Sequence, residues 1–330
     1  MSFGSRIVRI LIADDDAMSR KMLQKTLETA GYQVTAVENG MLAKEQLCRP
    51  DGPRLALLDW IMPELDGPGV CRAVRQKLDH PYVYMVLLTS KESKADTIAG
   101  LESGADDYLT KPFNPEELKA RLRTGLRILD LQDRLVEARE QMRFRATHDT
   151  LTHLWNRGVI TDLLTRELAR GRRERANIAV ILGDLDHFKK INDTYGHLAG
   201  DEVLRETSRR LLASVRSYDY IGRYGGEEFL VVLSNCEAQH AFARAEQIRK
   251  AISGKPMETA VGSLSVTMSL GLLLSKDWGP RPLEETLNLV DAALYAAKAA
   301  GRDCVKLAEL PADRDIPATP LAPVDVHGKR

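Results

Sequence analysis

Short apolar runs that alternate with helix-patterned stretches restrict the fold of the first third of the chain more than any other feature. The run Ile7–Ala13 is apolar apart from Arg9, and the stretch Met18–Ala30 that follows has apolar residues at helical spacing. Further strand-like runs lie at Val34–Val37, Leu55–Leu58, Val83–Leu88 and Tyr108–Thr110. Continuous apolar strands that alternate with helices are typical of a parallel sheet with helices on both faces. We therefore predict an α/β domain with a doubly wound parallel sheet.

An uninterrupted helical pattern begins after Pro115 and continues to about Thr147. Within it, apolar residues fall at spacings of 3, 4, 3 and 4, at Ile128, Leu131, Leu135, Ala138 and Met142. This spacing, with charged residues in between, is typical of a two-stranded coiled coil. The alternative is one long helix that packs on its own domain. We predict a first domain over residues 1–125 and a helical coiled-coil linker over residues 126–147.

The rest of the chain mixes strands and helices in a second domain, which we place at residues 148–309. Its strand-like runs are Ile178–Leu185, Tyr220–Gly222, Phe229–Leu233 and Ser265–Leu274. Its helical stretches include Asp201–Arg216, Ala238–Ser253 and Leu283–Ala300. Residues 310–330 are rich in Pro, Ala and charge and show no period, so we predict a disordered tail.

Length, charge and cysteine usage limit the function classes. A chain of 330 residues fits two domains of about 150 residues each. Lys plus Arg and Asp plus Glu number 47 each, and this neutral balance argues against nucleic-acid and membrane-surface binding. The cysteines Cys48, Cys71, Cys236 and Cys304 are scattered, which is typical of reduced thiols in a cytosolic protein.

The N-terminus lacks a signal-peptide core, and we find no apolar stretch long enough for a membrane span. We expect a cytoplasmic protein.

Carboxylates follow two predicted strands of the first domain. Asp14, Asp15 and Asp16 come directly after the first strand, and Asp59 comes directly after the third. In an open parallel sheet, residues just past the carboxyl ends of the strands share one crevice. Carboxylates gathered there repel each other unless a cation joins them, and Mg²⁺ prefers such oxygen ligands. A lone Asp at a strand end is more often a helix N-cap, so the signal lies in the ordered set.

A hydroxyl and an ammonium complete this set. Thr89 ends the fourth predicted strand, and Lys111 ends the fifth. Carboxylate, metal, hydroxyl and lysine together can form and hold an acyl phosphate. The motifs LIADDD, LLDWIMPELDG, VLLTS and YLTKPF, over residues 7 to about 125, resemble a response-regulator receiver domain with a flavodoxin-like fold.

This resemblance implies that Asp59 accepts a phosphoryl group from a cognate histidine kinase or phosphotransfer protein. The receiver Mg²⁺ site it implies consists of Asp14, Asp15, Asp59 and the backbone carbonyl of Ile61. Thr89 and Lys111 would contact the phosphate, and Tyr108 matches the aromatic switch position.

A Gly-Gly pair lies between two apolar strands of the second domain, in the segment Arg223–Phe229. Gly-Gly is a favoured two-residue hairpin loop, because both glycines tolerate positive φ. Glu227 and Glu228 would lie beside bare backbone that a phosphate can approach. A surface hairpin with solvated acids is the alternative.

Asp184 lies in a mostly apolar strand, where a lone carboxylate is costly. A metal shared with Glu227 and Glu228 would supply the missing partner. Carboxylates of neighbouring strands that bind Mg²⁺ on a nucleotide triphosphate are the arrangement of two-metal polymerases. The turn after Asp184 offers backbone N–H groups, and Lys189 a point charge, for phosphates.

The second domain resembles a GGDEF diguanylate cyclase domain over about residues 148–308. The matching segments are DTLT at 149–152 with Asn156-Arg157, GDLDHFKKINDTYGHLAGDEVL at 183–204, RYGGEEFLVVL at 223–233 and KAAGR at 298–302. His153 departs from the glycine that is common in the family. The resemblance implies an α+β domain with a sheet like that of polymerase palms and nucleotidyl cyclases.

The GGDEF resemblance also implies roles for individual residues. Asp184, Glu227 and the carbonyl of Leu185 would bind Mg²⁺, with Mn²⁺ as the alternative cofactor, and Glu228 would be a further metal or catalytic carboxylate. Lys189, Lys298 and Arg302 would contact phosphates, while Asn192 and Asp201 would recognise the base.

Asp201 can accept two hydrogen bonds from guanine but would repel adenine N1. It is also predicted to cap the helix over Glu202–Arg216. His197 matches a position near the nucleotide, although a structural histidine is equally consistent.

An RxxD segment, Arg216 to Asp219, ends five residues before Gly225. Its placement matches the family's inhibitory site, where arginines bind the phosphates and guanine edges of cyclic di-GMP. A surface ion pair is the alternative. The basic cluster Arg170–Arg175 would supply a second arginine, Arg170, unless it is a solvated loop.

The resemblances together predict a two-component response regulator that condenses 2 GTP to cyclic di-GMP and 2 pyrophosphate. Because two nucleotides must face each other, we expect a homodimer or higher homo-oligomer, activated by phosphorylation of Asp59 and inhibited by its product. The alternative is a catalytically silent module that senses cyclic di-GMP through Arg216 and Asp219. A receiver with a nucleic-acid output is disfavoured by the neutral charge and the lack of a helix-turn-helix signal.

Overall fold

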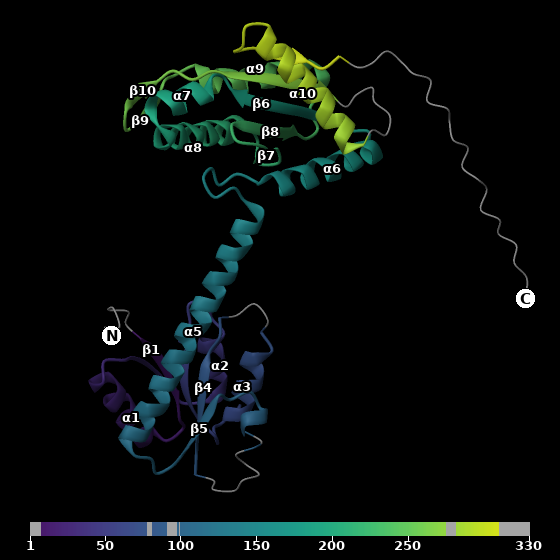
Figure 1. Cartoon of the computed structure of the whole chain (residues 1–330). Helices are drawn as coiled ribbons and strands as arrows, with labels where there is room; N and C mark the ends of the chain where they lie inside the picture. Colours follow the sequence, from purple (N-terminus) through teal and green to yellow (C-terminus); the bar gives the residue numbers. More distant parts are fainter. Residues whose placement is uncertain (1–7, 78–80, 91–97, 99, 275–281, 310–330) are drawn as a thin grey trace, which may run out of the picture. The chain divides into compact units, whose positions relative to one another are not determined.

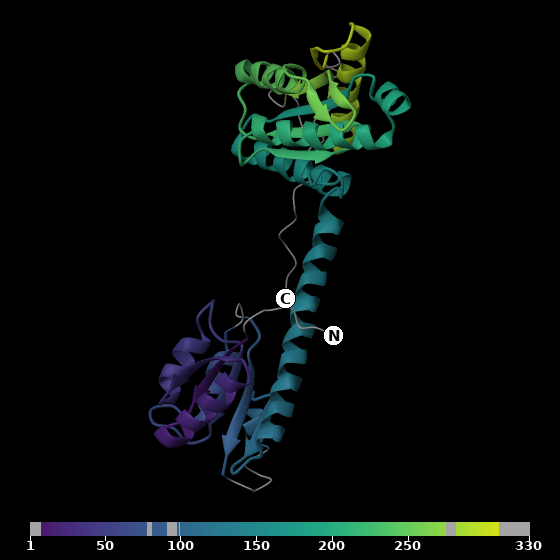
Figure 2. The ribbon, with the colours of Figure 1, turned by 90° about the vertical axis from the view of Figure 1, so that its left-hand side faces the viewer.

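The computed structural model describes residues 8–77, 81–90, 98, 100–274 and 282–309, and Figures 1 and 2 show it in two views. The chain divides into two compact units, Met1–Gln141 and Met142–Arg330. The predicted tail over residues 310–330 lies outside the described residues. In the described part of the chain, no helix is both long and apolar enough to cross a bilayer.

The N-terminal unit contains a five-stranded parallel sheet in the order β2-β1-β3-β4-β5. The strands are β1 (Arg9–Ala13), β2 (Gln33–Val37), β3 (Leu55–Asp59), β4 (Tyr84–Thr89) and β5 (Asp107–Thr110). Successive side chains of β1 point to opposite faces, so that Leu11 joins one core cluster whereas Ile10 and Ile12 join the other. Both faces are therefore buried, and the predicted doubly wound parallel sheet is confirmed.

Helices cover both faces of this sheet (Figure 1). Residues of α2 (Gly40–Leu47) and α3 (Gly67–Arg75) lie in the first cluster, and those of α1 (Ala17–Thr29) and α5 (Pro115–Thr147) in the second. In the parallel register Ala13 pairs with Leu58 and Asp59 with Leu88. The residues that end or follow the strands thus lie along one edge of the sheet.

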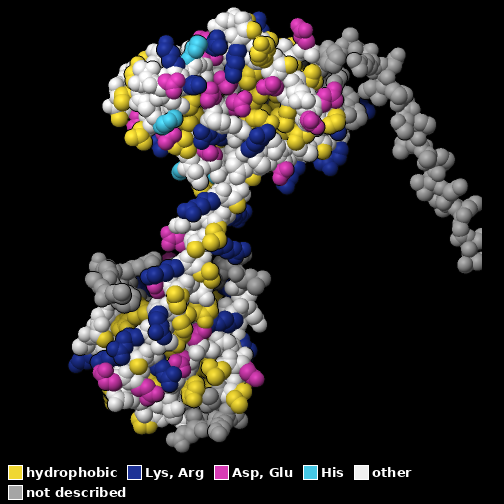
Figure 3. Space-filling model, in the orientation of Figure 1, with side chains coloured by type: hydrophobic (Ala, Val, Ile, Leu, Met, Phe, Trp, Pro, Cys, Tyr) yellow, Lys and Arg dark blue, Asp and Glu magenta, His cyan; other side chains and the backbone are white. Residues whose placement is uncertain are grey.

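Helix α5 has two different parts. Leu118, Leu122 and Leu129 are buried in the core of the N-terminal unit, and Ile128 packs against the same cluster. Farther along, Leu131, Leu135 and Met142 are 58%, 64% and 72% exposed, and Figure 3 shows hydrophobic side chains among basic ones along this helix. The first part agrees with the alternative of a helix packed on its own domain. The exposed part leaves an apolar stripe, for which the coiled coil stays a prediction.

The C-terminal unit contains a mixed sheet in the order β12-β11-β6-β8-β7. Its strands are β6 (Ala179–Leu185), β7 (Tyr220–Arg223), β8 (Glu228–Leu233), β11 (Met268–Leu274) and β12 (Val305–Leu307). The central strand β6 runs antiparallel to both β8 and β11. A separate hairpin joins β9 (Met257–Thr259) and β10 (Gly262–Leu264).

Helices pack on both faces of the mixed sheet as well. They are α6 (Arg157–Glu174), α7 (Phe188–Tyr195), α8 (His197–Ser214), α9 (Ala238–Ser253) and α10 (Leu283–Ala299). Residues of α8 and α9 lie in one core cluster, and residues of α6 and α10 in the other. This α+β arrangement agrees with the prediction.

Several element boundaries differ from the predictions. Helix α8 begins at His197 with Gly196 as its N-cap, so the predicted cap role of Asp201 is wrong, because Asp201 lies in the second turn of the helix. The strand predicted over Ser265–Leu274 begins only at Met268. The predictions also lacked α7, the β9–β10 hairpin and β12, which are short, and the longer helix α6. The alternative of a solvated loop over Arg170–Arg175 is wrong, because α6 extends to Glu174.

Gly271 allows α10 to lie close to β11. A Cβ atom at Gly271 would lie 2.3 Å from the carbonyl oxygen of Val290 and 2.5 Å from the amide nitrogen of Leu294. Both obstacles are backbone atoms of α10, so the helix as a whole would have to shift.

We therefore expect Gly271→Ala to lower the free energy of unfolding by about 1–3 kcal/mol through overpacking. Gly158→Ala is the matched control, since a Cβ there meets only Asn156 Oδ1 at 3.5 Å. Urea unfolding followed by circular dichroism measures both variants. Equal stability of the two would show that α10 does not depend on this close approach.

Candidate functional site

The first candidate site lies at the carboxyl ends of β1 and β3. Asp14 is fully buried, Asp59 is partly buried and Asp15 is exposed. One carboxylate oxygen from each of the three lies within 4.8 Å of the others. Among the described residues this is the one acidic group of three that meets this distance. The donor set fits Mg²⁺, which takes oxygen ligands from a few carboxylates.

Lys111 joins this group from the end of β5. Its Nζ lies 2.9 Å from Asp14 Oδ2 and 2.9 Å from Asp59 Oδ2. Burial alone would lower the pKa of Lys111, but the hydrogen bonds to the two carboxylates outweigh burial and raise it. Burial raises the pKa of Asp59 in spite of the neighbouring ammonium. The predicted phosphorylation residue is thus held by a lysine that can also contact a phosphate.

The other predicted receiver residues surround this pair. Thr89 is buried at the end of β4, and its carbonyl oxygen accepts a hydrogen bond from the Lys111 amide. Tyr108 is partly buried beside the core, and Ile61 is exposed next to Asp59. Pattern reading missed Ser19, whose hydroxyl donates to Asp14 Oδ2 at 2.7 Å.

The second candidate site lies where β6 ends and β8 begins. Asp184 pairs with Glu228 across the two strands, and the Leu185 amide donates to the Glu227 carbonyl oxygen. Asp184 is buried, and Lys298 Nζ of α10 lies 2.8 Å from its Oδ2. Lys298 was predicted to contact phosphate, whereas here it is the direct partner of the buried carboxylate.

The surroundings of the three carboxylates of this site disfavour their charged forms. Burial raises the pKa of Asp184, Glu227 and Glu228, and the charge of Asp184 raises those of the two glutamates further. Lys298 opposes this shift at all three groups, and Arg302 opposes it at Asp184, but neither reverses it. A divalent cation with oxygen ligands suits such a group.

The Gly-Gly loop differs from the predicted two-residue turn. Neither Gly225 nor Gly226 has positive φ, and the loop spans Gly225–Glu227 because Tyr224 already bonds to Glu228. A Cβ on Gly225 would lie 2.4 Å from Glu228 Oε2, whereas Gly226 has open space. A side chain at position 225 would therefore displace the Glu228 carboxylate from its present place, whereas the φ of Gly225 does not require glycine.

Two arginines hold this loop. Arg223 donates to the Gly226 carbonyl oxygen through Nε and Nη2, and its Nη1 lies 3.1 Å from Asp149 Oδ1. Arg157 lies over the ring of Tyr224, 4.6 Å from its centroid. Pattern reading placed all of these residues inside matching motifs but assigned none of them this task.

Four of the predicted nucleotide residues, Lys189, Asn192, His197 and Asp201, lie on α7 and α8. Lys189 is exposed in the first turn of α7, and His197 is exposed at the start of α8. A Cβ on Gly200 would lie 2.0 Å from Asn192 Oδ1, so the missing side chain lets Asn192 lie against α8. Asp201 follows Gly200 in α8 and is partly buried, and base recognition by Asn192 and Asp201 stays a prediction.

Within the RxxD segment the Asp219 side chain is buried, whereas Arg216 is exposed. The Asp219 side chain is 2% exposed, accepts a hydrogen bond from the Arg216 amide and lies 3.0 Å from Arg244 Nη2 of α9. Arg170, the predicted second arginine, pairs with Glu167 and Glu174 instead. Arg244 was missed, because nothing in the sequence ties a helix residue 25 positions onward to Asp219.

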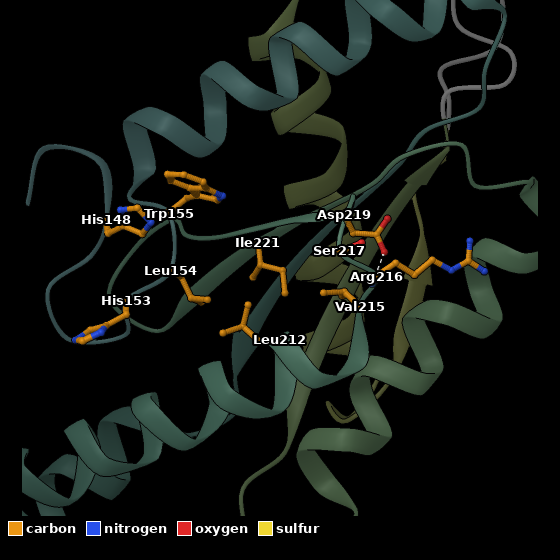
Figure 4. Close-up of a pocket in the computed structure, with 10 residues that line it drawn as sticks. All are labelled: His148, His153, Leu154, Trp155, Leu212, Val215, Arg216, Ser217, Asp219 and Ile221. Atoms are coloured by element: carbon orange, nitrogen blue, oxygen red, sulfur yellow. Dashed lines mark hydrogen bonds between the residues drawn. The ribbon is translucent and has the colours of Figure 1, made fainter. Parts of the chain in front are cut away.

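A cavity of about 420 Å³ lies beside this segment, and Figure 4 shows its lining. His148, His153 and Trp155 lie on one side, and Leu212 and Ile221 on another. The Arg216 side chain extends away from the histidines in this view.

Comparison with known proteins agrees with these geometries. Residues 146–304 match the family model "Diguanylate cyclase, GGDEF domain", and residues 10–123 match the model "Response regulator receiver domain". The chain therefore carries a response-regulator receiver domain followed by a GGDEF domain.

Curated relatives share this organisation. Response regulator PleD of Caulobacter vibrioides is 32% identical over 299 residues, which are 90% of this chain and 65% of PleD. Diguanylate cyclase DosC of Escherichia coli is 34% identical over 204 residues, or 60% of this chain and 44% of DosC. This chain therefore spans less than two thirds of the length of either relative.

A solved structure matches the C-terminal part. It is the coiled coil and GGDEF domain of DgcB from Caulobacter crescentus in complex with c-di-GMP. The two chains are 32% identical with a TM-score of 0.50, over 58% of this chain and 99% of the DgcB chain.

Proposed function

We propose that this protein is a phosphorylation-controlled diguanylate cyclase, which condenses 2 GTP to cyclic di-GMP and 2 pyrophosphate. The observation that carries the proposal is the meeting of Asp184 with Glu228 at the open end of β6, beside the Gly225 backbone and Lys298. We assign residues 1–125 to the receiver domain, 126–147 to the linker and 148–309 to the cyclase domain.

Asp184, Glu227, Glu228 and the carbonyl of Leu185 would hold Mg²⁺ or Mn²⁺. The raised pKa values of the three carboxylates support this, because burial and, second, neighbouring negative charge disfavour their charged forms, and a bound cation offsets both effects. The metal would activate a 3′-hydroxyl group and stabilise charge that develops on the α-phosphate.

The chain's own side chains would place the nucleotide. Lys189, Lys298 and Arg302 supply positive charge for the triphosphate. Asn192 and Asp201 face the base from adjacent helices. Since each domain holds one GTP, two chains must meet, and the exposed apolar stripe of α5 is the surface we assign to dimerisation.

Replacement of Asp184 tests the chemistry. Asp184→Asn keeps the shape of the side chain but removes its charge, so we expect product formation to fall by about a hundredfold or more. Cyclic di-GMP is measured by chromatography, and metal-dependent GTP binding by calorimetry. Glu258→Gln, an exposed acid on β9, is the control and should retain activity. Near-normal turnover of folded Asp184→Asn would exclude this carboxylate from the reaction.

Control by phosphorylation is supported by the Asp14, Asp15 and Asp59 group with Lys111. A histidine kinase or phosphotransfer protein would supply the phosphoryl group. We expect an acyl-phosphate donor to raise cyclase activity of the native chain and to leave Asp59→Asn at its unphosphorylated activity. Asp51→Asn, an exposed acid of the same unit, should respond like the native chain. An equal response of Asp59→Asn and native chain would place the switch elsewhere.

Product inhibition is supported by the arginines that surround Asp219. Arg216→Ala removes one guanidinium without touching the catalytic carboxylates. Because hydrogen bonds to charged groups contribute about 1.5–3 kcal/mol, the inhibitory concentration of cyclic di-GMP should rise about tenfold or more. Inhibition curves at fixed GTP measure the change. Unchanged inhibition would assign Arg216 to the structural pair with Tyr218.

Selectivity for guanine is assigned to Asp201. Asp201→Ser removes the acceptor pair that matches guanine and repels adenine, so the preference for GTP over ATP should fall about tenfold or more. Stability should change little, because Asp201 is inside α8 and Ser has a helix propensity similar to that of Asp. Competition between equimolar GTP and ATP, with products resolved by mass, decides the question. Undiminished GTP preference would place base recognition on other residues.

A further inference from the structure

The turn that follows α10 has an unusual backbone. Gly301, Arg302 and Asp303 have φ angles of 109°, 66° and 44°, which are three successive positive values. Positive φ costs free energy at residues other than glycine, and such a conformation persists only where surrounding contacts hold it. Arg302, one of the predicted phosphate contacts, lies in the middle of this turn.

A buried carboxylate holds the turn from the sheet side. Asp186 is 5% exposed, and its Oδ2 accepts a hydrogen bond from the Asp303 amide at 3.1 Å. The same carboxylate accepts from Thr267 Oγ1 at 2.7 Å and from Ser269 Oγ at 2.6 Å. These donors come from two segments far apart in the sequence. Asp186 therefore ties the turn to the end of β6 and the start of β11, next to the Asp184 site.

A second contact holds the turn from the helix side. Arg249 of α9 forms an ion pair with Asp303, and Glu246 holds the same guanidinium one helical turn away. Within the turn, the Arg302 amide donates to the Ala297 carbonyl oxygen. The backbone of Arg302 is thus fixed on both sides, while its side chain stays exposed.

The turn lies beside the carboxylate site, because Asp186, which accepts from the Asp303 amide, is two residues from Asp184. Arg302 contributes a favourable interaction to Asp184, the partner of Lys298. An arginine binds a triphosphate more tightly when part of its conformation is fixed before the nucleotide binds. Ordering a free arginine costs conformational entropy, and the fixed backbone of Arg302 reduces that cost.

We propose that Asp186 and Arg249 are positioning residues for the triphosphate of the nucleotide, because they hold the left-handed turn that presents Arg302. The inference rests on the proposed function for the identity of the nucleotide, but not for the contacts that build the turn. Neither residue touches the substrate in this scheme, and both act through Arg302.

The test compares single and double variants of the full-length chain. Asp186→Asn keeps the side-chain volume but replaces acceptor capacity with a donor, and Arg249→Met removes the ion pair but keeps the aliphatic stem. Each should raise the KM for GTP about tenfold, in the range known for outer contacts of a site, with a smaller change in kcat. Arg249→Lys keeps a cation opposite Asp303 and should restore most of the lost affinity.

Double variants separate positioning from general destabilisation. In the Arg302→Ala background, Asp186→Asn and Arg249→Met should add little further loss, because the group through which they act is already gone. Losses that multiply would overturn the proposal, as would an unchanged KM in both single variants. Arg209→Met is the matched control, since Arg209 also pairs with a glutamate on an exposed helix face and should leave KM unchanged.

Calorimetry with a non-hydrolysable GTP analogue and Mg²⁺ repeats the comparison without turnover. If the native chain binds the analogue but forms no cyclic di-GMP, the proposed function fails while the positioning scheme is still tested by affinity. If Asp186→Asn does not fold, Arg249→Met and its Arg249→Lys rescue decide the outcome.

Discussion

Crowded carboxylates at strand ends are the constraint on which both halves of this chain depend. In the receiver domain Asp14 and Asp59 share one ammonium, that of Lys111. In the GGDEF domain Lys298 binds Asp184 in the same way. Partly buried carboxylates raise one another's pKa, so each fold must bring a cation to them. Lysine suits this task because its ammonium is a compact charge on a flexible stem, able to move between a carboxylate and a phosphate.

The two domains reach this arrangement by different sheet geometries. In the parallel sheet, neighbouring strands end at the same height, so their last residues lie along one edge of the sheet. The pairing of Ala13 with Leu58 shows this register. In the mixed sheet, β6 and β8 run in opposite directions, so the end of one strand lies beside the start of the next. Asp184 and Glu228 meet for that reason. Close backbone approach at Gly225 then makes room for a carboxylate that a larger residue would displace.

Strand and helix positions could be predicted because the apolar periods are long and uninterrupted, and helix α9 begins and ends at the predicted residues. The pairings of Lys298 with Asp184 and of Arg244 with Asp219 could not, since each joins segments whose distance depends on tertiary packing. Asp201 shows the limit of local rules, because a good cap residue lies in the second turn of a helix that Gly196 begins. The residue type suggested a cap at Asp201, but the start of α8 is set four residues earlier by His197.

The signature loop is also tied to the end of α5. Asn156 donates to the carbonyl oxygen of Ala146 through its side chain, and its amide donates to that of Thr147. The next residue, Arg157, covers the ring of Tyr224, whose amide bonds to the Glu228 carbonyl oxygen.

A parallel route runs from Asp149 through Arg223 to the Gly226 carbonyl oxygen. Both routes consist of a few short polar contacts between partly exposed groups, which are individually weak. The loop that carries Glu227 and leads into Glu228 is therefore held by the same segment that ends α5. A change in the last turn of α5 can reach Glu228 through these contacts, and also through the bridges of His148 to Trp155 and of Trp155 to Gly222, because Gly222 lies on β7, the strand that pairs with β8.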